Sequence, residues 1–179
     1  MSKTNTTKAA KADDNKQELK SRSVYVRGAI CDVMYGKRSF KKGGDKVDKY
    51  RISIKAERED MDKLAEAAEP YYEDTDEKWL PKWLTDPEAR EYLNLASNYD
   101  IPAGMRGADK TIEELGNLYQ YVNEHGNVNG SKCVIMLTIK PGAVYPSSIL
   151  LKEIQHKTMA DMFAGYDDED DEADELPFT

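Results

Sequence analysis

The residues best suited to chemistry in this chain are cations and aromatic rings in one polar segment, 36–48. This segment separates two strand-like stretches, and Tyr35 and Tyr50 stand at its two ends. Lysine and arginine offset phosphate charge and release counterions, while aromatic faces stack on unpaired bases whatever their sequence. Each stacked base contributes about 1–3 kcal/mol, so two or three rings would matter. We therefore predict a nucleic-acid-binding hairpin whose loop and strands supply Arg27, Tyr35, Lys37, Arg38, Phe40, Lys41, Lys42, Lys46, Lys49, Arg51 and Lys55.

An ordinary lysine-rich hairpin is the alternative interpretation, because aromatic residues in strands are mostly buried. Tyr50 is the weakest of the candidates, since it shares a strand face with Ile52 and Ile54.

Residues that could catalyse a reaction are sparse. His125 and His156 have no cysteine or second histidine at ligand spacing, so we expect no metal site. Cys31 and Cys133 are far apart, which is typical of buried thiols in a reducing cytoplasm. Carboxylate pairs such as Glu113-Glu114 occur in two-metal nucleases, yet solubility and helix-dipole effects also explain them. We expect no enzyme activity and no cofactor, with a metal-dependent nuclease as a third interpretation.

Charge is unevenly distributed along the 179 residues. Residues 1–58 hold 16 Lys+Arg against 7 Asp+Glu, whereas residues 59–166 hold 10 against 19. Eight of the 34 acids lie in 167–179, and the remaining 26 balance the 26 Lys+Arg, so the net charge of −8 belongs to the tail. This polarity is typical of a protein that handles a polyanion, although solvated charged faces would give the same pattern.

Two strands must position the basic hairpin. Residues 23–35 are rich in β-branched and aromatic types, and Gly28 predicts a bulge or sharp bend. Residues 49–57 alternate, with Lys49, Arg51, Ser53 and Lys55 on one face.

A helical insertion is expected over 58–126. Helical spacing from Arg58 ends at Pro70, and Gly126 is the expected stop of the last helix. Thr85-Asp-Pro-Glu88 and Thr111-Ile-Glu-Glu114 both look like helix starts.

Strand character returns at 132–140, which is nearly all apolar, as for a strand covered on both faces. A loop is expected over 140–148 and a last strand over 149–154. The order predicts a mainly β, α+β domain, best satisfied by a small antiparallel barrel.

Three regions follow from these patterns: a disordered basic arm at 1–21, a domain at 22–157, and a linker with a disordered acidic tail at 158–179. The arm lacks the apolar run of a signal peptide, and no stretch approaches the roughly 20 apolar residues needed to cross a bilayer. A cytoplasmic protein without a membrane partner is expected.

The basic aromatic hairpin, the strand-type C-terminal part and the tail resemble single-stranded-DNA-binding proteins of bacteria and their phages. Asp174-Glu-Leu-Pro-Phe178 is similar to the Asp-Asp-Ile-Pro-Phe tip of the bacterial proteins, and 149–155 resembles the last barrel strand of phage members. The resemblance implies a five-stranded oligonucleotide/oligosaccharide-binding (OB) barrel that coats single strands in the cytoplasm of a bacterium or an infected host cell. It also implies that Asp174, Glu175, Leu176, Pro177 and Phe178 recruit replication, recombination and repair proteins. Thr179 after Phe178 and the long insertion depart from the family pattern, and the latter favours a divergent phage form.

The leading hypothesis is a protein that binds single-stranded DNA with little sequence preference and whose acidic tail competes with DNA. A homodimer is compatible with the sequence. The alternative is an acidic DNA mimic or chaperone-like protein that binds basic proteins through its acidic middle third.

Overall fold

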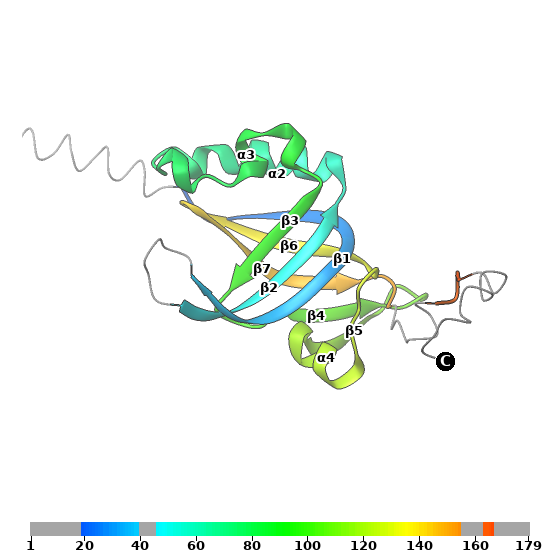
Figure 1. Cartoon of the computed structure of the whole chain (residues 1–179). Helices are drawn as coiled ribbons and strands as arrows, with labels where there is room; N and C mark the ends of the chain where they lie inside the picture. The colour runs from blue at the N-terminus through cyan, green and yellow to red at the C-terminus, as the bar shows by residue number, and fades with distance from the viewer. Residues whose placement is uncertain (1–18, 40–45, 155–162, 167–179) are drawn as a thin grey trace, which may run out of the picture.

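A computed structural model describes residues 19–39, 46–154 and 163–166, which form a mainly β, α+β fold (Figure 1). Its strands are β1 (Arg22–Ser39), β2 (Lys46–Ala56), β3 (Tyr92–Ser97), β4 (Pro102–Arg106), β5 (Ile112–Asn117), β6 (Lys132–Lys140) and β7 (Ala143–Leu151). Its helices are α2 (Arg58–Ala68), α3 (Lys82–Thr85) and α4 (Leu118–His125), with single 3-10 turns η1 (Glu69–Tyr72), η2 (Glu77–Trp79) and η3 (Pro87–Ala89).

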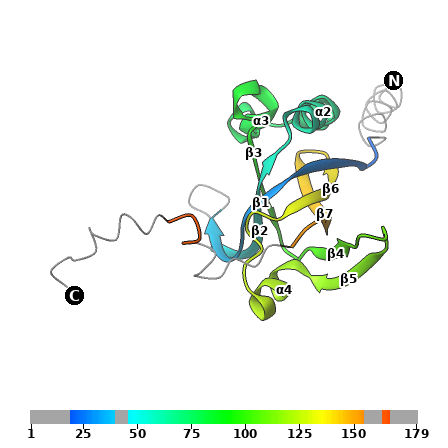
Figure 2. The same ribbon diagram turned by 90° about the vertical axis from the view of Figure 1, so that its right-hand side faces the viewer.

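The described strands form one mixed sheet in the order β3-β2-β1-β6-β7-β4-β5. All neighbours are antiparallel except β4 and β7, which run parallel. β3 contacts β7, but no ladder joins the two strands in the described part of the chain, so the sheet is an open one. Figures 1 and 2 show α2 and α3 above strands β1, β2, β3, β6 and β7, and α4 with the β4–β5 hairpin below these five strands.

β1 is long because it pairs with two strands, β6 and β2, over different parts of its length. Its first half pairs with β6 and its second half with β2, and Gly28 and Ala29 belong to both ladders. A Cβ on Gly28 would lie 2.4 Å from the backbone oxygen of Lys55, so only glycine lets β2 approach here. The bulge predicted at Gly28 is not at this residue, because the register shift between β1 and β2 falls between Ile30 and Asp32.

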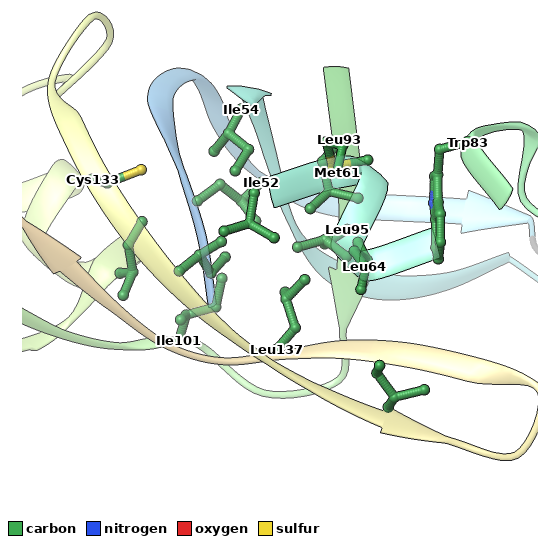
Figure 3. Packing of buried hydrophobic residues seen from close by; sticks show 14 of the residues in the cluster. Ile52, Ile54, Met61, Leu64, Trp83, Leu93, Leu95, Ile101, Cys133 and Leu137 are labelled. Carbon is green, nitrogen blue, oxygen red and sulfur yellow. The ribbon is translucent and has the colours of Figure 1, made fainter. Parts of the chain in front are cut away.

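The core lies on the inner face of the sheet (Figure 3). Ile52 and Ile54 of β2 are buried, and every second residue of β6 from Cys133 to Ile139 is buried as well. Met61 and Leu64 bring α2 onto this face. The alternation predicted for 49–57 and the helical spacing predicted after Arg58 are thus confirmed.

The prediction of a purely helical insertion over 58–126 is wrong, because β3, β4 and β5 lie within it. After Thr85 the chain makes only the short turn η3, in which the Glu88 N–H donates to the capping carboxylate of Asp86. Residues 112–117 pair with β4, and Gly116 at φ +81° cannot continue a right-handed helix. Strand pairing overrides the helix-start signature at Thr111, and α4 begins only at Leu118.

Other boundaries also differ. Gly126, at φ 99°, ends α4 as predicted. The expected loop 140–148 shrinks to a tight turn at Pro141-Gly142, with Gly142 at φ +75°, and β7 begins at Ala143. Pro146 sits inside β7 beside a register shift, where a missing N–H is tolerated.

The strand predicted at 132–140 is confirmed as β6, but its outward-facing residues are half-buried, so it is not fully covered on both faces. Near the expected arm, Leu19 packs against the core and the carbonyl of Lys20 accepts a 2.6 Å hydrogen bond from the Tyr71 hydroxyl.

Candidate nucleic-acid interface

The outer face of β1, β2 and β3, opposite the core, carries the polar residues predicted on β2. We call this surface the three-strand face. Arg51 lies opposite Met34 of β1 and Ala96 of β3, and Lys55 lies opposite Tyr92 of β3. Met34 and Tyr92 are 44% and 47% exposed, which is high for large apolar side chains on strands. A hollow of about 480 Å³ opens on this face, lined by Asp32, Met34, Arg51, Ile52, Ser53, Asn94 and Leu95.

Arg51 is the most informative residue of the three-strand face. Its Nε atom is buried and has no hydrogen-bond partner among the residues that the structure describes. Asp32 lines the same hollow, but its carboxylate accepts from the backbone N–H of Val33 at 2.9 Å, and no described ion pair links it to Arg51. A buried donor without an acceptor costs about 1–3 kcal/mol. An acceptor supplied by a bound ligand would remove this cost, and the planar fork of a guanidinium matches a phosphate.

Lys49 and Lys55 of β2 both contact polar side chains. Lys49 donates to the side-chain oxygen of Asn98. The Nζ atom of Lys55 lies 3.7 Å from Oε1 of Glu91, and both side chains are about 60% exposed. Exposed pairs of this kind contribute about 0–1 kcal/mol, so a phosphate can replace Glu91 at little cost.

Arg27 is engaged differently, although the sequence places it among the same candidates. Its Nε and Nη2 atoms donate to the two carboxylate oxygens of Asp60 on α2 at 2.8 and 3.0 Å. The hydrogen bond from Arg27 holds the pKa of the Asp60 carboxyl below its usual range and raises the pKa of Arg27. Asp60 also accepts from the Arg27 backbone N–H at 2.9 Å, so the pair fastens α2 to β1. A DNA contact by Arg27 stays a prediction.

Tyr35 and Tyr50 lie on the core side of the hairpin rather than on the three-strand face. Their ring centroids are 4.5 Å apart, and Tyr119 of α4 lies 5.7 and 5.8 Å from them. Burial in this cluster, with a further contribution from Asp48, raises the pKa of Tyr35. Tyr35 is still 44% exposed, whereas Tyr50, which shares a strand face with Ile52 and Ile54, is half-buried.

The basic loop itself lies largely outside the described residues. Lys37, Arg38 and Lys46 belong to the ends of β1 and β2, where Lys37 pairs with Asp48, but their side chains are not described. Phe40, Lys41 and Lys42 fall outside the described ranges, as do the tail residues 174–178.

Sequence reasoning missed Met34, Tyr92 and Asn94. A signal was present, because Leu93 and Leu95 alternate with polar neighbours over 92–97 as a half-buried strand requires. Because Thr85 looked like a helix start, residues 92–97 were assigned to the expected helical insertion.

The described residues contain no group of three or more His, Cys, Asp or Glu side chains that could hold a metal ion. Burial raises the pKa of Cys133 to about 12, which leaves its thiol unreactive. Within the same ranges, no helix is long and apolar enough to cross a membrane.

Comparison with known proteins gives no family for this chain. No protein family matches its sequence, and a search of curated proteins found no match.

Proposed function

We propose that this protein is a non-enzymatic binder of single-stranded DNA with little sequence preference. The observation that carries the proposal is the unpartnered Nε of Arg51, buried on a face that also bears Lys49, Lys55 and two exposed apolar side chains. A row of cationic side chains can bind the phosphates along a nucleic-acid backbone. Exposed aromatic or apolar side chains can pack against unpaired bases. A duplex keeps its bases stacked inside, so it would use only the cations of this surface.

We further propose that the sheet is a divergent OB barrel. The run β3-β2-β1-β6-β7 and the contact of β3 with β7 support this interpretation. In such a barrel the three-strand face is where oligonucleotides bind.

In this mechanism the phosphates of one strand lie along Lys49, Arg51 and Lys55, while Met34 and Tyr92 contact bases. Side chains that stack on any base give little sequence preference. The acidic segment 167–179 competes for the same cations and, once displaced by DNA, recruits partner proteins of replication, recombination or repair.

The test is a titration of labelled oligo-dT and of a duplex of equal length, each over a salt series beginning near 50 mM. We expect tighter binding of the single strand, and a gain in affinity at low salt when residues 167–179 are removed. Equal affinity for the two nucleic acids, or no binding of either, would reject the proposal.

One observation favours a second candidate, an acidic protein that mimics DNA and binds basic proteins. A hollow of about 600 Å³ on the helical side of the sheet is lined by four carboxylates, and among them only Asp62 is ion-paired in the described structure. The other three are Glu66, Glu69 and Glu73. Capture of a basic protein such as a histone, without binding of any oligonucleotide, would favour this candidate.

A further inference from the structure

Lysines continue across the outer face of the sheet beyond the three-strand face. Ala29 of β1 lies between Lys55 of β2 and Lys132 of β6 in the two ladders. Lys152, just after β7, donates its backbone N–H to the carbonyl of Lys132 at 2.8 Å. With neighbouring strands about 4.8 Å apart, the row from Tyr92 of β3 to Lys152 spans roughly 20 Å.

A hollow of about 420 Å³ lies in the middle of this row. Gly28 and Ala29 line it, and Gly28 cannot carry a larger side chain because of the nearby backbone of β2. The two small residues leave space between the lysines that line the hollow, Lys55, Lys132 and Lys152.

The cations of this hollow are not neutralised equally. Arg27 also lines it but is paired with Asp60. Lys132 and Lys152 are exposed, and no ion pair involves either of them among the described residues. Glu57 is the single carboxylate of the lining. The hollow therefore presents positive charge to solvent.

A larger groove of about 690 Å³ adjoins the hollow, and Lys152 lines both. The groove lies between the first half of β1, strands β6 and β7, and the β4–β5 hairpin. Its charged lining residues are Arg106, Lys152 and one carboxylate, Glu114. Tyr25 stands on its wall with 62% of its surface exposed, facing Met136 across the β1–β6 ladder. An exposed ring beside apolar side chains and two cations is suited to an unpaired base and its phosphate.

We propose that a single strand leaving the three-strand face continues over this hollow into the groove. Lys132 and Lys152 bind its phosphates, and Tyr25 stacks on a base. This inference rests on the proposed function, because it extends the same DNA path. It predicts that a long oligonucleotide uses more of the protein than a short one.

The test compares oligo-dT of about 6 and about 20 nucleotides, since one OB unit covers roughly 4–16. The variant is Lys132→Ala with Lys152→Ala, and the control is Lys78→Ala with Lys82→Ala, which removes two exposed lysines from the helical side. For the long oligonucleotide we expect about tenfold weaker binding by the hollow variant and a salt slope lower by about 1.4, or about 0.7 for each lost phosphate contact. Binding of the short oligonucleotide should not change.

Tyr25→Leu separates stacking from charge, because it should weaken binding of the long oligonucleotide without altering the salt slope. Melting temperatures check that the variants fold, as all three side chains are exposed. Unchanged binding of the long oligonucleotide by the lysine variant, or equal losses for both lengths, would overturn the extended path. If the unaltered protein binds neither oligonucleotide, the proposed function fails, and this inference fails with it.

Discussion

Replacing Arg51 with methionine should make the protein more stable and a weaker binder of DNA. The buried Nε of Arg51 has no acceptor among the described residues, and such a donor costs about 1–3 kcal/mol. Methionine keeps an unbranched apolar stem at the same position and removes the unsatisfied group. A gain of about 1 kcal/mol would raise Tm by roughly 2–4 °C in a chain of this size.

DNA binding should change in the opposite direction. A hydrogen bond to a charged group contributes about 1.5–3 kcal/mol, so losing it weakens Kd by roughly 10- to 150-fold. The salt slope should fall by about 0.7, as for one phosphate contact on a single strand.

Calorimetry measures the first effect and fluorescence anisotropy with labelled oligo-dT measures the second. Lys82→Ala on α3 is the control, because it removes one exposed cation far from the three-strand face and should change neither quantity appreciably. A lower Tm together with unchanged affinity in the Arg51→Met variant would refute the reasoning, since it would show that Arg51 supports the fold and does not bind DNA.

Three further predictions concern the scaffold. Gly28→Ala places a Cβ 2.4 Å from a β2 backbone oxygen and should destabilise the fold by about 1–3 kcal/mol in denaturant unfolding, whereas Gly36→Ala, with open space around it, should be neutral; equal effects would contradict the packing argument. The pKa of Asp60 is lowered by its hydrogen bond from Arg27, so its stabilisation is full above about pH 5 and is lost as pH falls through the folded-state pKa, below the ordinary value of about 3.9. The Tm difference between the protein and Asp60→Asn should therefore be large near neutrality and shrink below about pH 4, and a constant difference would count against the ion pair. With a pKa of about 12, Cys133 should resist alkylation at pH 8 until the protein unfolds, as mass spectrometry of iodoacetamide-treated samples would show; rapid labelling of the native protein would be inconsistent with its burial.

The strands that position the candidate site could be predicted because their alternation has one dominant cause. On β2, Ile52 and Ile54 must face the core, which places Arg51 and Lys55 outward whatever else the chain does. The same reasoning identified β6, and the conformational freedom of glycine identified Gly126 as the end of α4.

The middle of the chain could not be predicted in the same way, because its strands depend on distant partners. Residues 112–117 carry a capping pattern typical of a helix, yet they pair with β4, which in turn pairs with β7 almost fifty residues away. The contact of Tyr35 with Tyr119 could not be predicted either, because Tyr119 belongs to α4 and is far from Tyr35 in the sequence. The ion pair of Arg27 with Asp60 shows that a charged residue on a strand need not be available to a ligand.

The central claim is that the three-strand face binds single-stranded DNA. The most direct measurement is photo-crosslinking of oligo-dT that contains 5-iodouracil, followed by mass spectrometry of the attached peptides. We expect adducts on Met34 and Tyr92, which are exposed on this face, and their loss in the Arg51→Met variant. Adducts confined to α2 and α3, or none on β1 and β3, would contradict it.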